Sequence, residues 1–168
     1  MLSKNAKVGL GIDVHAFSLP EAGRALIIGG VNIPYERGLA GHSDADVLVH
    51  AVMDALLGAA RLPDAQDIGA LFPDTDPAFK DANSIDLLQN LGLMLANAGY
   101  EVMDIDCVVI AQVPRLSPYR DQMRKNVAGA LGIAVEQVGI KATTTEHLGF
   151  EGREEGISAH AIALLGTS

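Results

Sequence analysis

The chain has 168 residues and a mass of 17.6 kDa, so we expect a single domain over residues 1–168 with one hydrophobic core. Hydrophobic residues make up 49% of the sequence and charged residues 20%, a balance that excludes an intrinsically disordered chain. Twelve Lys and Arg against 21 Asp and Glu give a formal net charge of −9, so we expect no nucleic-acid partner, because tight phosphate binding requires a basic surface.

The sequence carries no signal for a membrane or for export. Its longest apolar stretch, 47–62, is interrupted by His50, Asp54 and Arg61, and is therefore unsuited to cross a bilayer. The first seven residues lack the apolar region of a secretory signal, and the single Cys107 excludes an internal disulfide. We expect a cytoplasmic protein with no membrane partner, in which Cys107 is a packing residue.

The first predicted elements are a strand and a hairpin. Residues 8–13 are typical of a short strand. Two apolar segments, 25–28 and 31–33, flank Gly29 and Gly30, and paired glycines between such segments indicate the tight turn of a β-hairpin.

A helix and a long connection follow. Ser43 followed by Asp46 resembles a capping box, and the apolar residues after it recur at helical spacing as far as Gly58. The segment 62–82 contains three prolines and five aspartates and has no periodicity. Irregular connections of this length in compact domains are more often functional than idle.

The second half of the chain alternates helices with strands. Its predicted elements are a helix over 84–99, a strand from 103 to about 112, a helix over 117–132, and strands over 138–145 and 157–165. This alternation predicts an α+β fold, an α/β sandwich with a mixed β-sheet, helices packed on one face and ferredoxin-like character.

One possible metal site is visible in the pattern. Asp13 and His15 share a face if they lie on a strand, because side chains alternate along it. His50 lies in an apolar helix with Asp46 and Asp54 one turn away on either side, so it is alternatively a core histidine satisfied by one of those carboxylates. A carboxylate and two imidazoles suit Zn²⁺ with an open fourth position, and also suit non-haem Fe(II).

Two polar segments are candidates for ligand contacts. The run from His42 to Asp46 precedes a helix, where free backbone N–H groups favour an anion, although Ser43 alone is also a plausible helix cap. The segment 72–77 is either a substrate loop or a surface turn. It is not an EF-hand, because Phe79 stands where that calcium loop requires glycine.

A third polar segment runs from Lys141 to Glu146. Its three consecutive threonine hydroxyls and the neighbouring backbone amides are suited to donate to phosphate oxygens, and Glu146 is suited to a hard divalent cation. Threonine runs are also common in ordinary strands, so the pattern by itself leaves both interpretations open.

The ordered set of motifs resembles the 2-C-methyl-D-erythritol 2,4-cyclodiphosphate synthase family, and the resemblance covers nearly the whole chain. The motifs are Asp13-Val14-His15, Gly41-His42-Ser43-Asp44-Ala45-Asp46, His50, Asp67-Ile68-Gly69, Phe72-Pro73-Asp74-Thr75-Asp76, Lys141 to Glu146 and Gly152 to Gly156. Any single motif is modest, whereas the set in this order is highly specific.

The resemblance implies a reaction and an assembly. The family converts 4-diphosphocytidyl-2-C-methyl-D-erythritol 2-phosphate into the 2,4-cyclodiphosphate with release of CMP, a metal-dependent intramolecular phosphoryl transfer in non-mevalonate isoprenoid precursor biosynthesis. The enzyme is accordingly a phosphorus-oxygen lyase whose partner is a small cytidine diphosphate. The family also implies a homotrimer with its active sites between subunits.

The resemblance also implies the metal and catalytic residues. One Zn²⁺ per subunit is expected on Asp13, His15 and His50. A second divalent cation, Mg²⁺ or Mn²⁺, is expected at Glu146. His42 and Thr144 match positions that stabilise the transition state in the family.

The implied substrate contacts form three groups. Around the zinc ligands they are Asp13, Val14, His15, His42 and Ser43. For the methylerythritol phosphate they are Asp67, Ile68, Gly69, Phe72, Pro73, Asp74, Thr75 and Asp76. For cytidine they are Ala111, Gln112, Val113, Pro114, Arg115, Leu116 and Ser117, and the set is completed by Thr143, Thr144, Thr145, Glu146, Phe150 and Arg153.

Two other functions use the same residues. A non-haem iron oxygenase would employ the two histidines and the carboxylate. That function gives no role to the threonine run within 141–146 or to the aspartate-rich segment 62–82. A non-catalytic diphosphate-binding module with a structural metal would normally provide four protein ligands, and the sequence offers three. Phosphoryl transfer fits better, because an ionised phosphate nucleophile needs charge stabilisation and positioning rather than an activated serine or cysteine.

Overall fold

The computed structural model describes residues 5–73, 75–79 and 82–167. Its strands are β1 (Lys7–Ala16), β2 (Leu26–Ile28), β3 (Val31–Ile33), β4 (Tyr100–Ile110), β5 (Val138–Thr143) and β6 (Gly156–Thr167). Its helices are α1 (Val47–Ala60), α2 (Ile68–Leu71), α3 (Ser84–Asn97), α4 (Arg120–Leu131) and α5 (Gly149–Gly152), with short 3-10 turns at Pro20–Ala22, Pro77–Phe79, Ser117–Tyr119 and Val135–Gln137.

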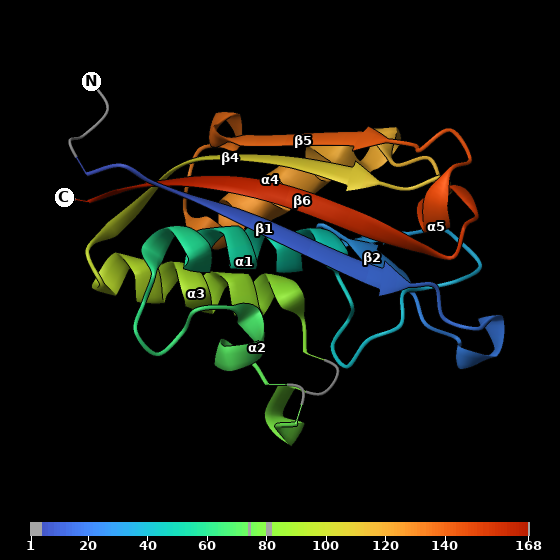
Figure 1. The fold of residues 1–168 in the computed structure, drawn as a ribbon, viewed down its shortest axis with the longest axis horizontal. Helices are drawn as coiled ribbons and strands as arrows, with labels where there is room; N and C mark the ends of the chain where they lie inside the picture. The colour runs from blue at the N-terminus through green and yellow to red at the C-terminus, as the bar shows by residue number, and fades with distance from the viewer. Residues whose placement is uncertain (1–4, 74, 80–81, 168) are drawn as a thin grey trace.

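Within the described residues, four strands form one mixed sheet in the order β1-β6-β4-β5. The β1–β6 and β6–β4 pairs are antiparallel, and the β4–β5 pair is parallel. In Figure 1, α4 lies behind the strands of this sheet, and α1 and α3 lie below them. The predicted α+β fold with a mixed sheet is confirmed, whereas the ferredoxin-like character stays a prediction.

The strand β1 and the helix α1 pack backbone against backbone. Alternation turns Gly9 and Gly11 toward α1, and a Cβ added at Gly9 would lie 2.0 Å from the carbonyl oxygen of Ala55. Only glycine permits so close an approach, which brings the end of β1 beside the first turn of α1. The helix itself is buried almost throughout, as its apolar sequence predicts.

The start of α1 corrects the predicted capping box. Asp46, not Ser43, is the N-cap, and its Oδ1 accepts the backbone N–H of Val49 at 3.1 Å. The same carboxylate accepts the N–H groups of Gly29 at 2.9 Å and Gly30 at 2.6 Å, in the turn of the predicted β2–β3 hairpin. Asp46 directly precedes the first helical residue, so its side chain can bind both the helix and the hairpin.

Several other boundaries differ from the predictions. The strand β4 begins three residues earlier than predicted, at Tyr100, and β5 ends at Thr143 rather than at Thr145. Beyond Thr143 the chain enters a turn in which Glu146 and His147 have positive φ angles of 53° and 62°, outside the region that strands adopt. Residues Ser117–Tyr119 form a 3-10 turn, and α4 begins at Arg120, three residues after the predicted helix start.

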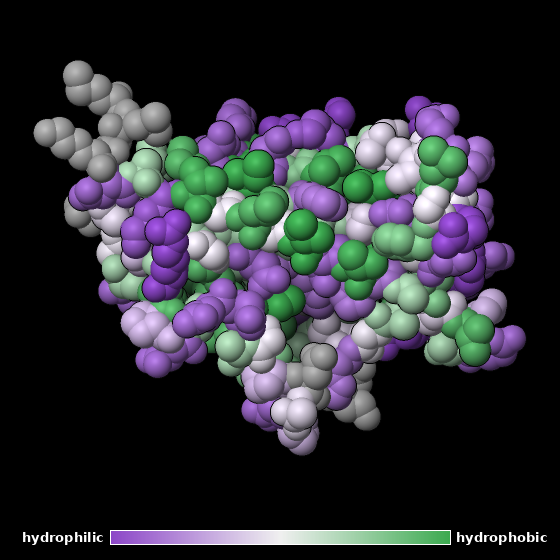
Figure 2. Space-filling view, viewed as in Figure 1, coloured by the Kyte–Doolittle hydropathy of each residue, from purple (hydrophilic) through white to green (hydrophobic). Residues whose placement is uncertain are grey.

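The opposite face of the sheet carries an apolar row. Figure 2, in the same view as Figure 1, shows apolar side chains across the strands on this face. The row comprises Val8, Leu10, Ile12 and Val14 of β1 and Ile162 of β6, which are 49–60% exposed. Contiguous exposed apolar surface of this kind marks an interaction surface. Among the described residues, no helix combines the length and apolar character needed to span a membrane.

Candidate functional site

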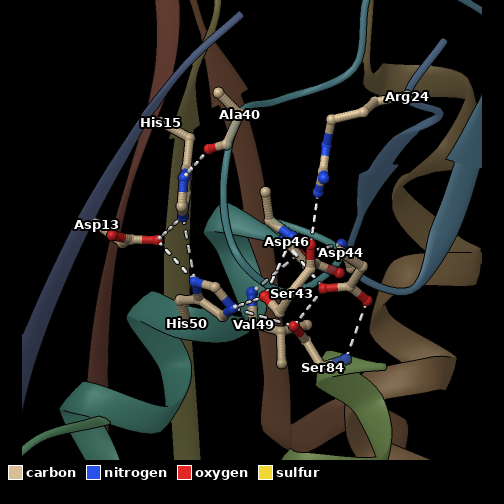
Figure 3. A network of polar contacts seen from close by, with 12 residues as sticks. Asp13, His15, Arg24, Ala40, Ser43, Asp44, Asp46, Val49, His50 and Ser84 are labelled. Carbon is tan, nitrogen blue, oxygen red and sulfur yellow. Dashed lines mark hydrogen bonds and ion pairs between the residues drawn. The ribbon is translucent and has the colours of Figure 1, made fainter. Parts of the chain in front are cut away.

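Three predicted metal ligands meet where β1 ends beside α1. Asp13 Oδ2 lies 2.9 Å from His15 Nε2 and 3.1 Å from His50 Nδ1, and the two ring nitrogens are 3.2 Å apart. Ligand atoms about 2.1 Å from one tetrahedral zinc ion would be separated by roughly 3.4 Å. The three atoms therefore face one point at spacings that fit a zinc ion, as Figure 3 shows.

The environment of His50 decides between the two predicted interpretations of this residue. The carboxylate that contacts His50 belongs to Asp13 of β1, whereas the Asp46 carboxylate accepts an N–H group of the β2–β3 turn. Asp54 accepts the backbone N–H of Ile68 at 2.8 Å. The interpretation in which Asp46 or Asp54 satisfies a core histidine is therefore wrong.

Asp13 and His15, both on β1, each stabilise the charged form of the other. Burial alone would raise the pKa of Asp13, but hydrogen bonds and charge from His15 and His50 outweigh it and lower that pKa well below its usual range. Burial alone would lower the pKa of His15, but the hydrogen bond and charge of Asp13 outweigh it and raise that pKa. A cation that binds here must therefore displace the proton from His15.

A backbone carbonyl orients the His15 ring. Nδ1 of His15 lies 2.7 Å from the carbonyl oxygen of Ala40, which can only accept, so Nδ1 carries the hydrogen. Neutral His15 then presents the lone pair of Nε2 toward Asp13 and His50. The segment after Ala40 leads directly to His42 and Ser43.

A hollow of about 200 Å³ opens beside the three ligands. Its lining includes His42 and Ser43 from the segment before α1, and Ile68, Gly69 and Phe72 from α2 and its end. His42 Nε2 is buried, and the described residues provide no hydrogen-bond partner for it. A buried imidazole nitrogen without a protein partner is suited to bind a ligand in this hollow.

The predicted methylerythritol loop is held to α1 by the side chain of Asp54. Asp67 caps α2 by accepting the N–H of Ala70 at 2.7 Å, and the next residue, Ile68, is bound by Asp54. The rings of Phe72 and Phe79 pack edge to face. Of the other residues predicted there, Pro73, Thr75 and Asp76 lie in the turn that follows α2, and Asp74 lies outside the described residues.

The predicted cytidine residues form a second, separate hollow of about 490 Å³. Its lining consists of Ala111, Gln112, Val113, Pro114, Arg115, Leu116, Ser117, Ala142, Thr143 and Thr144. It shares none of the described residues that line the hollow beside the metal ligands. One chain therefore presents the two predicted halves of the site as two distinct surfaces.

The remaining predicted residues lie outside both hollows. Thr145, Glu146 and Phe150 follow β5, and Thr144 Oγ1 donates to Glu146 Oε1 at 2.9 Å. Arg153 forms an exposed ion pair with Glu155 at 2.8 Å, and the Val14 side chain lies on the apolar face. Among the described residues, Glu146 joins no group of three or more potential metal ligands.

The sequence patterns include Asp44 and Asp54 but do not reveal what these side chains contact, and they give no sign of Ser84. Asp44 and Ser84 hydrogen-bond in a chain that reaches His50 Nε2, and Asp54 anchors α2. The available signal was weak, because polar residues before a helix are usually helix caps. Asp54 lies one turn after His50 on a buried helix, and a carboxylate at such a position was the stronger clue.

The sequence profile of the YgbB family matches residues 6–166 of this chain. The chain belongs to the YgbB family. Among curated relatives, 2-C-methyl-D-erythritol 2,4-cyclodiphosphate synthase of Rubrobacter xylanophilus is 56% identical over 95% of this chain and 94% of the relative. The enzyme of the same name from Enterococcus faecalis is 54% identical over 95% of this chain and 98% of the relative.

Solved structures agree with membership of the YgbB family. The bifunctional IspDF from Campylobacter jejuni has a TM-score of 0.90 and 42% identity over 97% of this chain, which spans only 42% of that longer protein. IspF of Plasmodium falciparum, in a complex with CDP, has a TM-score of 0.82 and 32% identity, with 97% of both chains covered.

Proposed function

We propose that the chain is a cyclising, CMP-releasing lyase that converts 4-diphosphocytidyl-2-C-methyl-D-erythritol 2-phosphate into 2-C-methyl-D-erythritol 2,4-cyclodiphosphate. The observation that carries this proposal is the convergence of Asp13, His15 and His50 beside the hollow that contains His42. It occurs in a chain that is 56% identical to a synthase of this name. Family membership gives no support to the iron oxygenase or to a non-catalytic binding module.

The reaction requires positioning and charge stabilisation. An oxygen of the 2-phosphate forms a bond to the β-phosphorus, the bond from that phosphorus to the bridging oxygen breaks, and CMP leaves with that oxygen and its electron pair. The nucleophile is already ionised near neutral pH, so the site needs no dedicated general base. A divalent cation on the three ligands supplies positive charge for the phosphate oxygens.

The residue roles follow from the two hollows. His42 is available to the phosphate groups, because its buried Nε2 has no described protein partner. Thr144 lines the second hollow, where its hydroxyl is suited to donate to charge that develops in the transition state. The ligand set of one carboxylate and two imidazoles favours Zn²⁺, and Glu146 is the proposed ligand of a second cation, Mg²⁺ or Mn²⁺.

The complete site is proposed to form between subunits of a homotrimer. Support comes from the separation of the two hollows within one chain and from the exposed apolar row on the sheet. A neighbouring copy that packs on Val8, Leu10 and Ile12 would cover surface that is costly to expose. The cytoplasmic location and the single domain expected from the sequence stay predictions.

The proposal is tested by incubating the purified chain with the cytidylyl substrate and Zn²⁺ plus Mg²⁺. Equal amounts of CMP and the cyclic diphosphate should appear, and a chelator should stop both. Substrate that binds without CMP release would indicate the binding module instead. Metal analysis of the same sample should find zinc, whereas stoichiometric iron would support the oxygenase.

A further inference from the structure

The hydrogen bonds on the far side of the His50 ring point to a role for two residues outside the predicted site. His50 Nδ1 faces Asp13 and His15, so the ring can bind a metal ion only if Nδ1 carries the lone pair. The hydrogen of the neutral ring must then be on Nε2. Which nitrogen carries it depends on the partners of both. Asp13 Oδ2, 3.1 Å from Nδ1, can only accept and favours a hydrogen on Nδ1, so the metal-binding tautomer requires partners that hold the hydrogen on Nε2.

Two hydroxyl groups lie close to Nε2. Ser84 Oγ, at the start of α3, is 3.1 Å away, and Ser43 Oγ is 3.3 Å away. A hydroxyl can either donate to an imidazole nitrogen or accept from it, so these distances alone leave the tautomer open. In this respect His50 differs from His15, whose partner is a carbonyl oxygen that can only accept.

Asp44 removes this ambiguity for Ser84, the closer of the two hydroxyls. Its Oδ1 lies 2.5 Å from Ser84 Oγ, and its Oδ2 accepts the backbone N–H of Ser84 at 2.9 Å. A carboxylate can only accept, so the Ser84 hydroxyl hydrogen is committed to Asp44. Ser84 Oγ then has only lone pairs left for His50 and must accept the hydrogen of Nε2. Figure 3 shows this chain of contacts from Asp44 through Ser84 to His50.

Burial makes the arrangement rigid. The Ser84 side chain is fully buried and His50 is 9% exposed, so water competes little for these hydrogen bonds. The backbone N–H of Asp44 also donates to the carbonyl oxygen of Ala82 at 3.2 Å. The start of α3 is thereby held against the segment that carries His42.

We propose that Asp44 and Ser84 are positioning residues that select the metal-binding tautomer of His50. The Asp44 carboxylate orients the Ser84 hydroxyl, and the hydroxyl holds the hydrogen on Nε2, so that Nδ1 presents its lone pair beside Asp13. The inference rests on the proposed metal site. It adds that metal binding at this site depends on Asp44 and Ser84, neither of which would contact the ion.

Zinc affinity of the full chain tests the proposal directly. The probe is Zn²⁺ alone, titrated into metal-free protein against a chromogenic chelator. Ser84→Ala removes the acceptor, and Asp44→Asn places an amide donor against Ser84, which frees the hydroxyl to donate to Nε2. Each variant should bind Zn²⁺ about 10- to 100-fold more weakly than the wild type. Ser18→Ala is the matched control, because it removes another buried hydroxyl, which donates to the Gly38 carbonyl oxygen at 3.0 Å.

A second readout separates tautomer selection from a general loss of structure. Nitrogen-15 NMR of the metal-free protein, at a pH where the imidazoles are neutral, should show His50 protonated on Nε2 in the wild type. Asp44→Asn should move that hydrogen toward Nδ1 while His15 keeps its tautomer. Circular dichroism would verify that each variant is folded, and Ser84→Thr, which keeps the hydroxyl, should recover most of the zinc affinity.

The outcomes are distinguishable. If the wild type itself does not bind Zn²⁺, the proposed metal site is wrong and the positioning role falls with it. If the wild type binds Zn²⁺ but Asp44→Asn or Ser84→Ala binds it equally tightly, the metal site stands and the positioning role is wrong. An unchanged His50 tautomer in Asp44→Asn would also overturn the inference.

Discussion

Gly11 of β1 lies directly against Ala51 of α1, and a Cβ added to Gly11 would be 2.0 Å from the Ala51 carbonyl oxygen. Ala51 follows the metal ligand His50, and Asp13 lies two residues after Gly11 on the same face of the strand. This backbone contact therefore sets the distance between the two elements that supply the metal ligands.

Gly11→Ala should separate β1 from α1. We expect a loss of about 3 kcal/mol in the free energy of unfolding, because the added methyl group meets backbone that cannot rotate away. Zinc affinity should fall as well. Gly129→Ala in α4 is the control, since a Cβ there meets nothing within 4 Å and should stabilise the helix by about 0.5–1 kcal/mol. Urea unfolding of both variants would check this, and an unaffected Gly11→Ala would contradict the close packing.

Single substitutions of the three ligands should abolish zinc binding and turnover. Asp13→Ala, His15→Ala and His50→Ala each remove one of three ligand atoms, which should cost most of the affinity. Wild-type binding should weaken as the pH falls, because the raised pKa of His15 places a proton in competition with the cation. Metal analysis and circular dichroism of the purified variants provide the measurement. A folded variant with wild-type zinc content would disprove the assignment.

Thr144→Val should lower kcat much more than it raises KM. The substitution is nearly isosteric and removes only the hydroxyl, which in the wild type donates to Glu146. If this donor acts on charge that develops in the transition state, kcat should fall about 100-fold. Thr144→Ser, which restores the hydroxyl, should recover most of the loss. Steady-state kinetics would decide, and an unchanged kcat with a raised KM would make Thr144 a ground-state contact.

Mixed trimers should recover activity from two inactive parents. One parent carries His15→Ala, and the other carries alanine at Thr143 and Thr144, so the lesions lie in different hollows. After unfolding, equal mixing and refolding, a site between subunits has both halves intact in about one case in four. Activity should therefore return to about a quarter of the wild-type value.

Mass measurement must first show that mixed trimers have formed. Confirmed mixed trimers without activity would mean that both halves of a site come from one chain. Refolding each parent alone is the control, and neither should regain turnover.

The buried carboxylate of Asp46 should make stability depend on pH. Burial raises the pKa of Asp46 from 3.8 to about 6, although the N–H groups of Gly30, Val49 and Gly29 oppose the rise. The folded state then binds the proton more tightly than the unfolded state does. This contribution is greatest below about pH 4 and is lost as the pH rises to about 6.

Comparison with Asp46→Asn isolates this effect. The stability difference between wild type and variant should fall as the pH rises from about 4 through about 6, because the proton that stabilises the folded wild type is lost over this range. Urea unfolding of the metal-free proteins at several pH values gives the measurement. Parallel stability curves would show that Asp46 titrates normally.

The sequence by itself determined the elements and the family. Alternation along β1 placed Asp13 and His15 on one face, and Gly29-Gly30 predicted the hairpin turn, because these signals depend on neighbours within a few residues. The ordered motifs also identified the family, because a motif is recognised by its residue types and spacing. That requires no knowledge of how the chain folds between motifs.

Only the tertiary structure determined which polar side chains bind one another. His50 has acidic residues one turn away on its own helix, yet its carboxylate partner is Asp13 from another element. Asp46 caps α1, and its carboxylate also accepts two N–H groups from a hairpin 16 and 17 residues earlier, a contact that no local pattern shows. A polar side chain takes whichever buried donor or acceptor would otherwise be unsatisfied, and that group is known only once distant segments are packed together.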